Sequence, residues 1–149
     1  MTDVVVVSSA GGVLLDVLAL RPWFAERQVR WVAEPAVDTH AELTGERVTW
    51  ANEDRSAAAV IREILRARRK LRRWRPRMLV SAGTAVAVPW FIAARMVAVP
   101  SVWVETWNIV GSRQGIAARI CARLARAVIV QRPERLTLHR RAVLAGELY

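Results

Sequence analysis

Short runs of apolar residues alternate with longer amphipathic stretches along the 149 residues of the chain. Such short runs are typical of strands buried on both faces of a sheet, and the longer stretches have the spacing of helices. The pattern predicts strands at residues 4–8, 29–33, 47–50, 78–81, 101–105, 127–131 and 142–145. It predicts helices at residues 13–25, 55–75, 89–97, 115–125 and 133–139. This alternation predicts an α/β fold, a Rossmann-like parallel sheet with helices on both faces.

The composition is that of a folded protein with a substantial core, because 54% of the residues are hydrophobic and glycine and proline are few. No internal repeat or linker divides the sequence, so we expect residues 1–149 to form one domain. The single cysteine, Cys121, excludes an internal disulfide and a cysteine-rich zinc site. With only two histidines in addition, we expect no metal and no cofactor. The first residues lack the basic region of an export signal, which predicts a cytoplasmic protein.

The most apolar segment, residues 78–104, contains a single charged residue and is long enough by hydropathy to cross a bilayer. A glycine and two prolines interrupt it into pieces of strand, helix and strand length. We therefore expect the segment to belong to the sheet and one helix rather than to span a membrane. Its middle piece is predicted to leave apolar side chains, among them Trp90 and Phe91, exposed at a membrane interface.

Most of the net positive charge lies in residues 62–77, which carry +8 of the net charge of +10. The apolar positions of this segment follow a helical stripe, so it predicts an amphipathic helix that ends at Pro76. Three interpretations stay open: the solvated face of a packed helix, a site for an anionic membrane surface, or a site for nucleic acid. No nucleic acid is expected, because only Trp74 lies within the segment for stacking on bases. The residues predicted to bind the membrane are Arg68, Arg69, Arg72, Arg73, Trp74, Trp90 and Phe91.

In a parallel sheet of this kind ligands bind at the carboxyl ends of the strands, so the loops after the strands are candidate sites. The loop at Ser8–Gly12 has two glycines before a helix, which suits either a backbone close to a phosphate or a tight turn without a ligand. The loop at Ser81–Pro89 leaves the same two alternatives. Glu105 follows the strand at 101–105 with Asn108 close behind. This carboxylate is suited to take a proton from a sugar hydroxyl, or else it only caps the loop.

Several motifs follow one another in a specific order: SSAGG, VLALRPWF, WVAE followed by Asp38 and Thr39, RPRMLVSAGTAVAVPWF, VPSVWVETWN and AVIVQRPE. The series resembles bacterial exopolysaccharide glycosyltransferases of the two-subunit type. It is also similar to the membrane-side subunit of the eukaryotic two-subunit enzyme that adds the second N-acetylglucosamine to dolichol diphosphate. A more distant likeness is to the N-terminal half of the lipid II-forming transferase of peptidoglycan synthesis. The resemblance covers nearly the whole chain.

The resemblance implies the acceptor-binding N-terminal half of a GT-B glycosyltransferase, in which two Rossmann-like domains face one another. It implies a partner subunit that holds the UDP-sugar, and transfer of the sugar to a lipid-diphosphate-linked saccharide in polysaccharide or glycolipid biosynthesis. The chain would then lie peripherally on the inner face of the cell membrane. The residues expected to bind the acceptor diphosphate are Ser9, Gly11, Gly12, Gly83, Thr84 and Asn108, with Glu105 as the catalytic group.

One position departs from these relatives, which have a histidine after the glycine pair of the first loop. This chain has Val13 there, and valine can neither accept a proton nor hydrogen-bond a phosphate. Either Glu105 or a group of the partner serves as the base, or the chain is a non-catalytic scaffold that recruits a partner to the membrane. His40, expected in a loop, is a less favoured substitute, and His139 is expected at the surface. A small-molecule Rossmann enzyme is a further alternative, which cofactor binding by the chain alone would favour.

Overall fold

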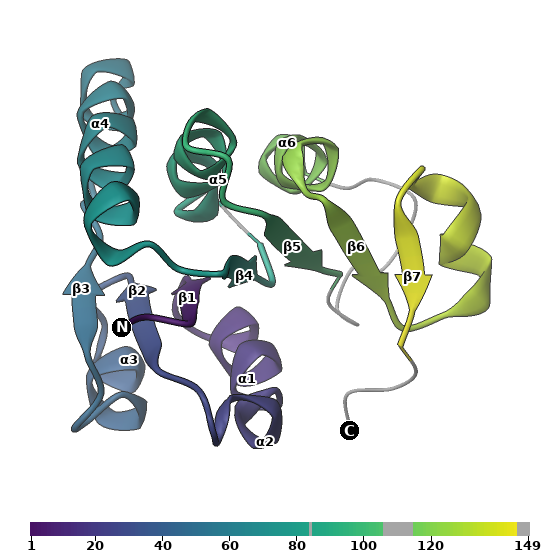
Figure 1. Ribbon diagram of the computed structural model, residues 1–149, viewed down its shortest axis with the longest axis horizontal. Helices are drawn as coiled ribbons and strands as arrows, with labels where there is room; N and C mark the ends of the chain where they lie inside the picture. Colours follow the sequence, from purple (N-terminus) through teal and green to yellow (C-terminus); the bar gives the residue numbers. More distant parts are fainter. Residues whose placement is uncertain (84, 106–114, 146–149) are drawn as a thin grey trace.

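The computed structural model describes residues 1–83, 85–105 and 115–145 and shows one sheet between two layers of helices (Figure 1). The described strands form a parallel sheet in the order β3-β2-β1-β4-β5-β6-β7. The strands are β1 (Val4–Ser8), β2 (Val29–Ala33), β3 (Val48–Trp50), β4 (Met78–Ser81), β5 (Ser101–Val104), β6 (Ala127–Val130) and β7 (Ala142–Leu144). The helices are α1 (Gly12–Leu18), α2 (Arg21–Phe24), α3 (Val37–Glu42), α4 (Ala57–Trp74), α5 (Ala87–Met96), α6 (Ile116–Leu124) and a 3-10 helix, η1 (Pro133–Leu138). The predicted fold class is confirmed.

Helices α4, α5 and α6 cover one face of the sheet, and α1, α2 and α3 cover the other (Figure 1). The side chains of β1 alternate between the two cores: Val5 and Val7 face the α4–α6 layer, and Val4 and Val6 face the α1–α3 layer. All five residues of β1 are buried. A strand that is covered on both faces reads as a continuous apolar run, which is why the strands could be found from the sequence.

The basic helix α4 begins at Ala57, after Ser56, whose side-chain oxygen accepts a hydrogen bond from the Ala59 amide at 3.2 Å. It ends at Trp74 because Arg75 adopts a left-handed conformation, with φ of 49°, and Pro76 follows. The prediction of a long helix that stops before Pro76 is therefore confirmed. Within the described residues, no helix combines the length and the apolar character needed to span a bilayer.

The helices of the α1–α3 layer differ from the prediction in two ways. The helix expected at residues 13–25 is divided into α1 and α2, since Pro22 lacks the amide that would continue α1 and instead lies in the first turn of α2. Helix α3 was not predicted, and it contains His40, which was expected in a loop. It is only six residues long, and the Thr39 hydroxyl accepts a hydrogen bond from the Ala36 amide at 2.9 Å. So short a helix has no periodic pattern to detect.

The prediction that Trp90 and Phe91 form an exposed apolar patch is wrong, because both are fully buried between the sheet and the neighbouring helices. Helix α5 packs against α4 on one side and α6 on the other. The indole nitrogen of Trp90 donates a hydrogen bond to Glu63 Oε1 of α4 at 3.1 Å, so the one polar atom of this side chain is satisfied inside the protein. Neither ring can reach a membrane in this structure.

Candidate functional site

The loop after β1 lies at the carboxyl edge of the sheet, and two of its backbone amides already have partners within this chain. The Gly11 amide donates a hydrogen bond to Asp38 Oδ2 at 2.6 Å, and the Ala10 amide donates to Glu34 Oε2 at 3.4 Å. Glu34 in turn forms an ion pair with Arg55. Two carboxylates therefore stand where a diphosphate was expected. Ser9 is buried and Gly12 is exposed, and α1 behind them has only seven residues.

Gly83 follows β4 at the same edge, and its role in the structure is steric. It has φ of 112°, and a Cβ atom there would lie 2.8 Å from Nε1 of Trp103. Its amide donates to Ser81 Oγ at 3.0 Å, so this group too is engaged within the chain. Thr84 and Asn108, the other residues expected to bind the diphosphate, lie outside the described residues.

Glu105, directly after β5, is buried in a cluster of polar side chains that come from beyond β6. One carboxylate oxygen accepts from Arg135 Nε, and the other lies 2.8 Å from His139 Nε2. Gln131 Nε2 donates to the Glu105 backbone oxygen at 2.9 Å. The side chain of His139 is only 10% exposed, and its ring meets Trp103 edge to face, so the expectation of a surface histidine is wrong.

The geometry of this cluster ties the end of β5 to the segment between β6 and β7. A carboxylate that accepts a hydrogen bond from a guanidinium and lies beside an imidazole is held in one orientation. Neither Arg135 nor Gln131 was predicted from the sequence as a site residue. Gln131 lies in the motif AVIVQRPE and Arg135 directly follows it, but nothing in the local pattern joins these residues to Glu105.

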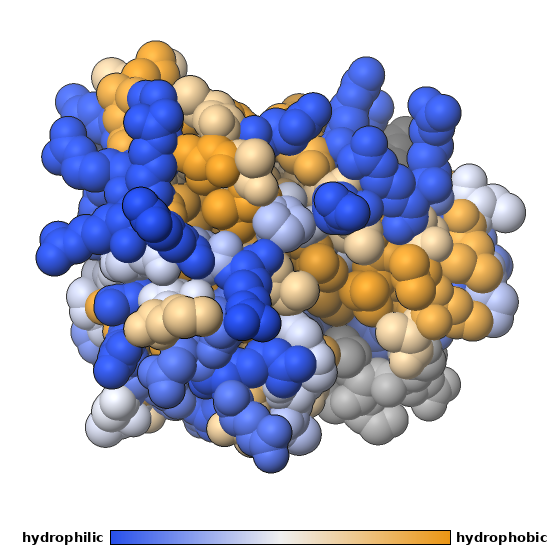
Figure 2. Space-filling model, viewed as in Figure 1, coloured by the Kyte–Doolittle hydropathy of each residue, from blue (hydrophilic) through white to orange (hydrophobic). Residues whose placement is uncertain are grey.

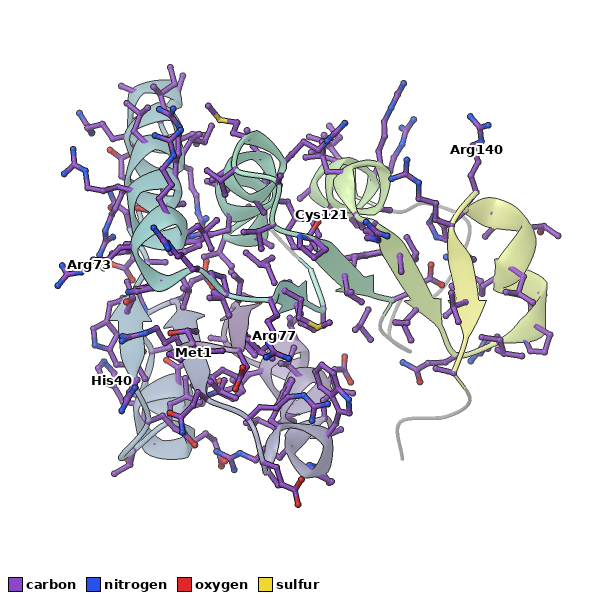
Figure 3. All side chains as sticks on the ribbon, viewed as in Figure 1. Met1, His40, Arg73, Arg77, Cys121 and Arg140 are labelled. Atoms are coloured by element: carbon purple, nitrogen blue, oxygen red, sulfur yellow. The ribbon has the colours of Figure 1, made fainter. Side chains whose placement is uncertain are left out.

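The arginines of α4 divide into a paired and an unpaired set. Arg66 is 3.2 Å from Glu63, and Arg62 is 4.0 Å from Asp54. Arg69, Arg72 and Arg73 are exposed and have no acidic partner in the described part of the chain. Figure 3 shows the side chain of Arg73 reaching outward from the lower end of the helix.

Two aliphatic side chains share the outer face of α4 with these arginines. Ile61 and Leu65 are one turn apart and more than half exposed. Met96 of α5 and Ile116 of α6, in the same helical layer, are also exposed. Figure 2 shows blue side chains over α4 and above α6, with orange side chains between them. An apolar surface bordered by cations is thus present, built from residues other than Trp90 and Phe91.

Trp74, also expected at the membrane, is half-buried at the end of α4. Its ring stacks on that of Trp90, with centroids 6.0 Å apart and planes 13° from parallel. The guanidinium of Arg30 and the ammonium of Lys70 each lie 5.0 Å from its centroid. Burial lowers the pKa of Lys70, and the nearby charges of Arg66 and Arg30 lower it further. Trp74 is therefore mainly a packing residue.

A hollow of about 380 Å³ opens at the carboxyl edge between the first turns of α4, α5 and α6. Its walls are mostly apolar, with Ala59, Val86 and Ile120 among them, and Glu63 and Asp54 add carboxylates. His40 does not line this hollow; it is exposed, and its ring centroid lies 4.0 Å from that of Trp50. Among the described residues, no group of three or more His, Cys, Asp or Glu side chains is placed to hold a metal ion.

Comparison with solved structures shows the fold family. MurG of Acinetobacter baumannii superposes with a TM-score of 0.79 at 20% identity, over 97% of this chain and 45% of that chain. S. aureus MnaA, solved with UDP, gives a TM-score of 0.70 at 11% identity, over 99% of this chain and 44% of that one. The UDP-N-acetylglucosamine 2-epimerase of Rickettsia bellii gives 0.69 at 15% identity, over 90% and 40%. No protein-family model and no curated protein matches the sequence.

The chain therefore has the Rossmann-like α/β fold of GT-B glycosyltransferase-like proteins. It spans less than half the length of each of these three structures.

Proposed function

We propose that this chain is the acceptor- and membrane-binding half of a UDP-sugar-dependent glycosyltransferase, and that a donor-binding GT-B half on a partner chain completes it. The observation that supports a GT-B half most is the superposition of 97% of this chain on part of MurG with a TM-score of 0.79. The partner chain is proposed from the resemblance to two-subunit enzymes. In a GT-B enzyme the cleft between two such halves holds the acceptor on one side and the nucleotide sugar on the other. The proposed reaction moves a sugar from a UDP donor to a lipid-diphosphate-linked saccharide.

The surface of the α4–α6 layer supports the membrane part of the proposal. Arg69, Arg72 and Arg73 have no acidic partner among the described residues and offer positive charge, and Ile61 and Leu65 offer apolar side chains beside it. An anionic lipid surface attracts such cations at about 1 kcal/mol for each Lys or Arg close to it. A lipid-linked acceptor requires the enzyme to work at this surface. We place the chain on the inner face of the cell membrane as a peripheral protein.

The acceptor is proposed to lie along the carboxyl edge of the sheet. The exposed Gly12, together with Ser9, Gly11, Gly83, Thr84 and Asn108, remains the proposed diphosphate site, and the apolar hollow at the first turns of α4–α6 supports a place for the adjoining lipid chain. Because Asp38 holds the Gly11 amide, a diphosphate has to displace this carboxylate or bind beside it. Glu105 is the proposed catalytic group, and Arg135 and His139 fix its orientation.

The test is to co-express the chain with the product of the neighbouring open reading frame and to assay membranes for sugar transfer from labelled UDP-N-acetylglucosamine, UDP-glucose and UDP-galactose. We expect a stable complex and transfer to a lipid diphosphate only when both chains are present. Tight binding of a UDP-sugar by this chain alone, followed by transfer without a partner, contradicts the proposal. So does the absence of any complex and of any membrane association.

A non-catalytic scaffold of the same fold is the second candidate, and specific observations favour it. Val13 provides no proton acceptor in the first loop, and both oxygens of Glu105 are engaged. A complex that forms and binds membranes but shows no transfer with any of the three UDP-sugars would identify the chain as a scaffold.

A further inference from the structure

A second basic surface lies apart from α4, in a groove between α6 and residues 138–141, just before β7. We call it the α6 groove. It encloses about 900 Å³ and is open to solvent. Arg119 and Arg123 line it from one face of α6, one helical turn apart, and Arg140 and Arg141 line it from the opposite side. Figure 3 shows Arg140 projecting from the start of β7, on the side of the sheet that α6 covers.

The positive charge of this groove is not balanced from within. No acidic residue lines it, and Arg119, Arg123 and Arg140 have no acidic partner among the residues that the structure describes. Arg141 donates to the Ala125 backbone oxygen at 2.9 Å, which holds the far wall against the end of α6. Arginines gathered in this way form a site for an anion with several oxygens, and a phosphate matches the fork of the guanidinium.

The same groove also exposes apolar side chains. Ile116 is 77% exposed and Leu138 is 57% exposed, and Ile120 lies between Ile116 and Arg123 along the helix. Exposed aliphatic residues of this size are unfavourable in water unless something covers them. A ligand that satisfies both features has a phosphate next to a hydrocarbon chain.

We propose that the α6 groove binds the headgroup of an anionic phospholipid, with the phosphate between Arg119, Arg123 and Arg140 and the first carbons of its chain on Ile116 and Leu138. The source is a membrane lipid because the groove belongs to the same helical layer as the exposed residues of α4 (Figure 1). The inference rests on the proposed membrane association but not on sugar transfer. On this proposal the protein contacts the bilayer at two places, the outer face of α4 and the α6 groove.

A second arginine-lined hollow on the opposite layer provides a matched control. It contains Arg27 and Arg47 beside α2, but Glu46 also lines it, and its large apolar members Phe24 and Trp31 are buried. This hollow has arginines, as the α6 groove does. It differs from the α6 groove because its large apolar side chains are buried and an acidic residue lines it. Changing two arginines there removes the same charge from the protein as changing Arg119 and Arg123.

The experiment titrates the chain with dihexanoyl phosphatidylglycerol, as free monomers, and follows binding by calorimetry. We expect one saturable site that Arg119→Ser with Arg123→Ser weakens by about 10-fold, because two charge-assisted hydrogen bonds to the phosphate are lost. Arg27→Ser with Arg47→Ser is expected to change the affinity by less than about twofold, since only screened long-range charge is removed. Arg140→Ser, outside the helix, is the second variant, and thermal melts confirm that each variant is folded.

Three comparison ligands complete the test. Equal binding of dihexanoyl phosphatidylcholine overturns recognition of the anionic headgroup, and equal binding of inorganic phosphate overturns the lipid as its source. An acidic peptide that binds more tightly than the lipid overturns the proposal and assigns the groove to a protein partner. Loss of sugar transfer in the reconstituted pair with intact lipid binding contradicts the proposed function alone, whereas transfer without saturable lipid binding contradicts this inference alone.

Discussion

Each of the two helical layers covers one face of the sheet, but the layers differ in how many charged residues on their outer surfaces have partners within the chain. In the α1–α3 layer several charged side chains have partners within the chain, although Arg27 and Arg47 have no acidic partner among the described residues: Arg21 lies 3.9 Å from Glu42, and Asp38 and Glu34 accept backbone amides of the first loop. In the α4–α6 layer Arg69 and Arg119 have no acidic partner among the described residues, and aliphatic side chains stand beside them. A surface whose charges are neutralised internally needs no counterion. The exposed arginines of the α4–α6 layer have no such internal counter-charge, and this difference supports the proposal that this layer meets an anionic surface.

The largest effect is expected beneath the α4–α6 layer, where charges are paired and buried. Glu105→Gln should lower the free energy of unfolding by about 3–5 kcal/mol, because it leaves Arg135 without its counter-charge in a buried position. Urea unfolding measures this change. Glu53→Gln, at an exposed position, is the control and should stay within about 0.5 kcal/mol of the original chain. Unchanged stability combined with lost sugar transfer would instead show that the carboxylate acts directly on the acceptor.

The next effect concerns the proposed membrane binding by α4. Arg69→Ser, Arg72→Ser and Arg73→Ser together should weaken binding to phosphatidylglycerol vesicles by about 100-fold, at about 1 kcal/mol for each cation, with little effect on folding. Sedimentation with vesicles at low and high salt measures it. The matched variant replaces Arg21, Arg27 and Arg47 of the opposite layer, which removes the same charge. If both triple variants lose binding equally, net charge rather than the α4–α6 layer attracts the membrane.

A smaller effect, an increase in affinity for a diphosphate, is expected in the α1–α3 layer. Asp38→Ala frees the Gly11 amide and removes a negative charge from the first loop, so affinity for a short-chain prenyl diphosphate should rise about fivefold, corresponding to roughly 1 kcal/mol. Glu42→Ala, on the same helix and with the same change in charge, should have no such effect. Equal affinities in both variants would place the diphosphate elsewhere than at this loop.

The smallest expected change is in the reactivity of Cys121, on the inner face of α6. Burial raises the pKa of its thiol to about 12 and excludes reagents, so the native protein should react very slowly with a thiol reagent at pH 8 and rapidly in guanidinium chloride. We expect this slow rate to persist on phosphatidylglycerol vesicles. A faster reaction on vesicles would mean that α6 moves away from the sheet when the protein binds. It would contradict lipid binding by the α6 groove without a change in structure.

Local pattern determined much of this protein from its sequence. The strands were visible because a parallel sheet covered on both faces requires unbroken apolar runs, as in Val4–Ser8, and α4 was visible because eighteen residues repeat a helical stripe with a clear end. The positive charge of α4 is a property of the sequence alone. Helix α5 carried a signal that was not used: a helix apolar on all sides is a buried helix, which is where Trp90 and Phe91 lie.

Tertiary structure alone decided which polar groups meet. Glu105 pairs with residues 30 and 34 positions further along, and Asp38 reaches an amide 27 positions before it. Periodicity indicates which face of an element is apolar. It does not indicate which other element packs there or which carboxylate accepts a hydrogen bond from a given backbone amide. Such contacts depend on the order of strands in the sheet and on the paths of the connecting segments. For that reason the fold could be predicted from the residues, whereas the occupied first loop and the buried partners of Glu105 appeared only when the chain was folded.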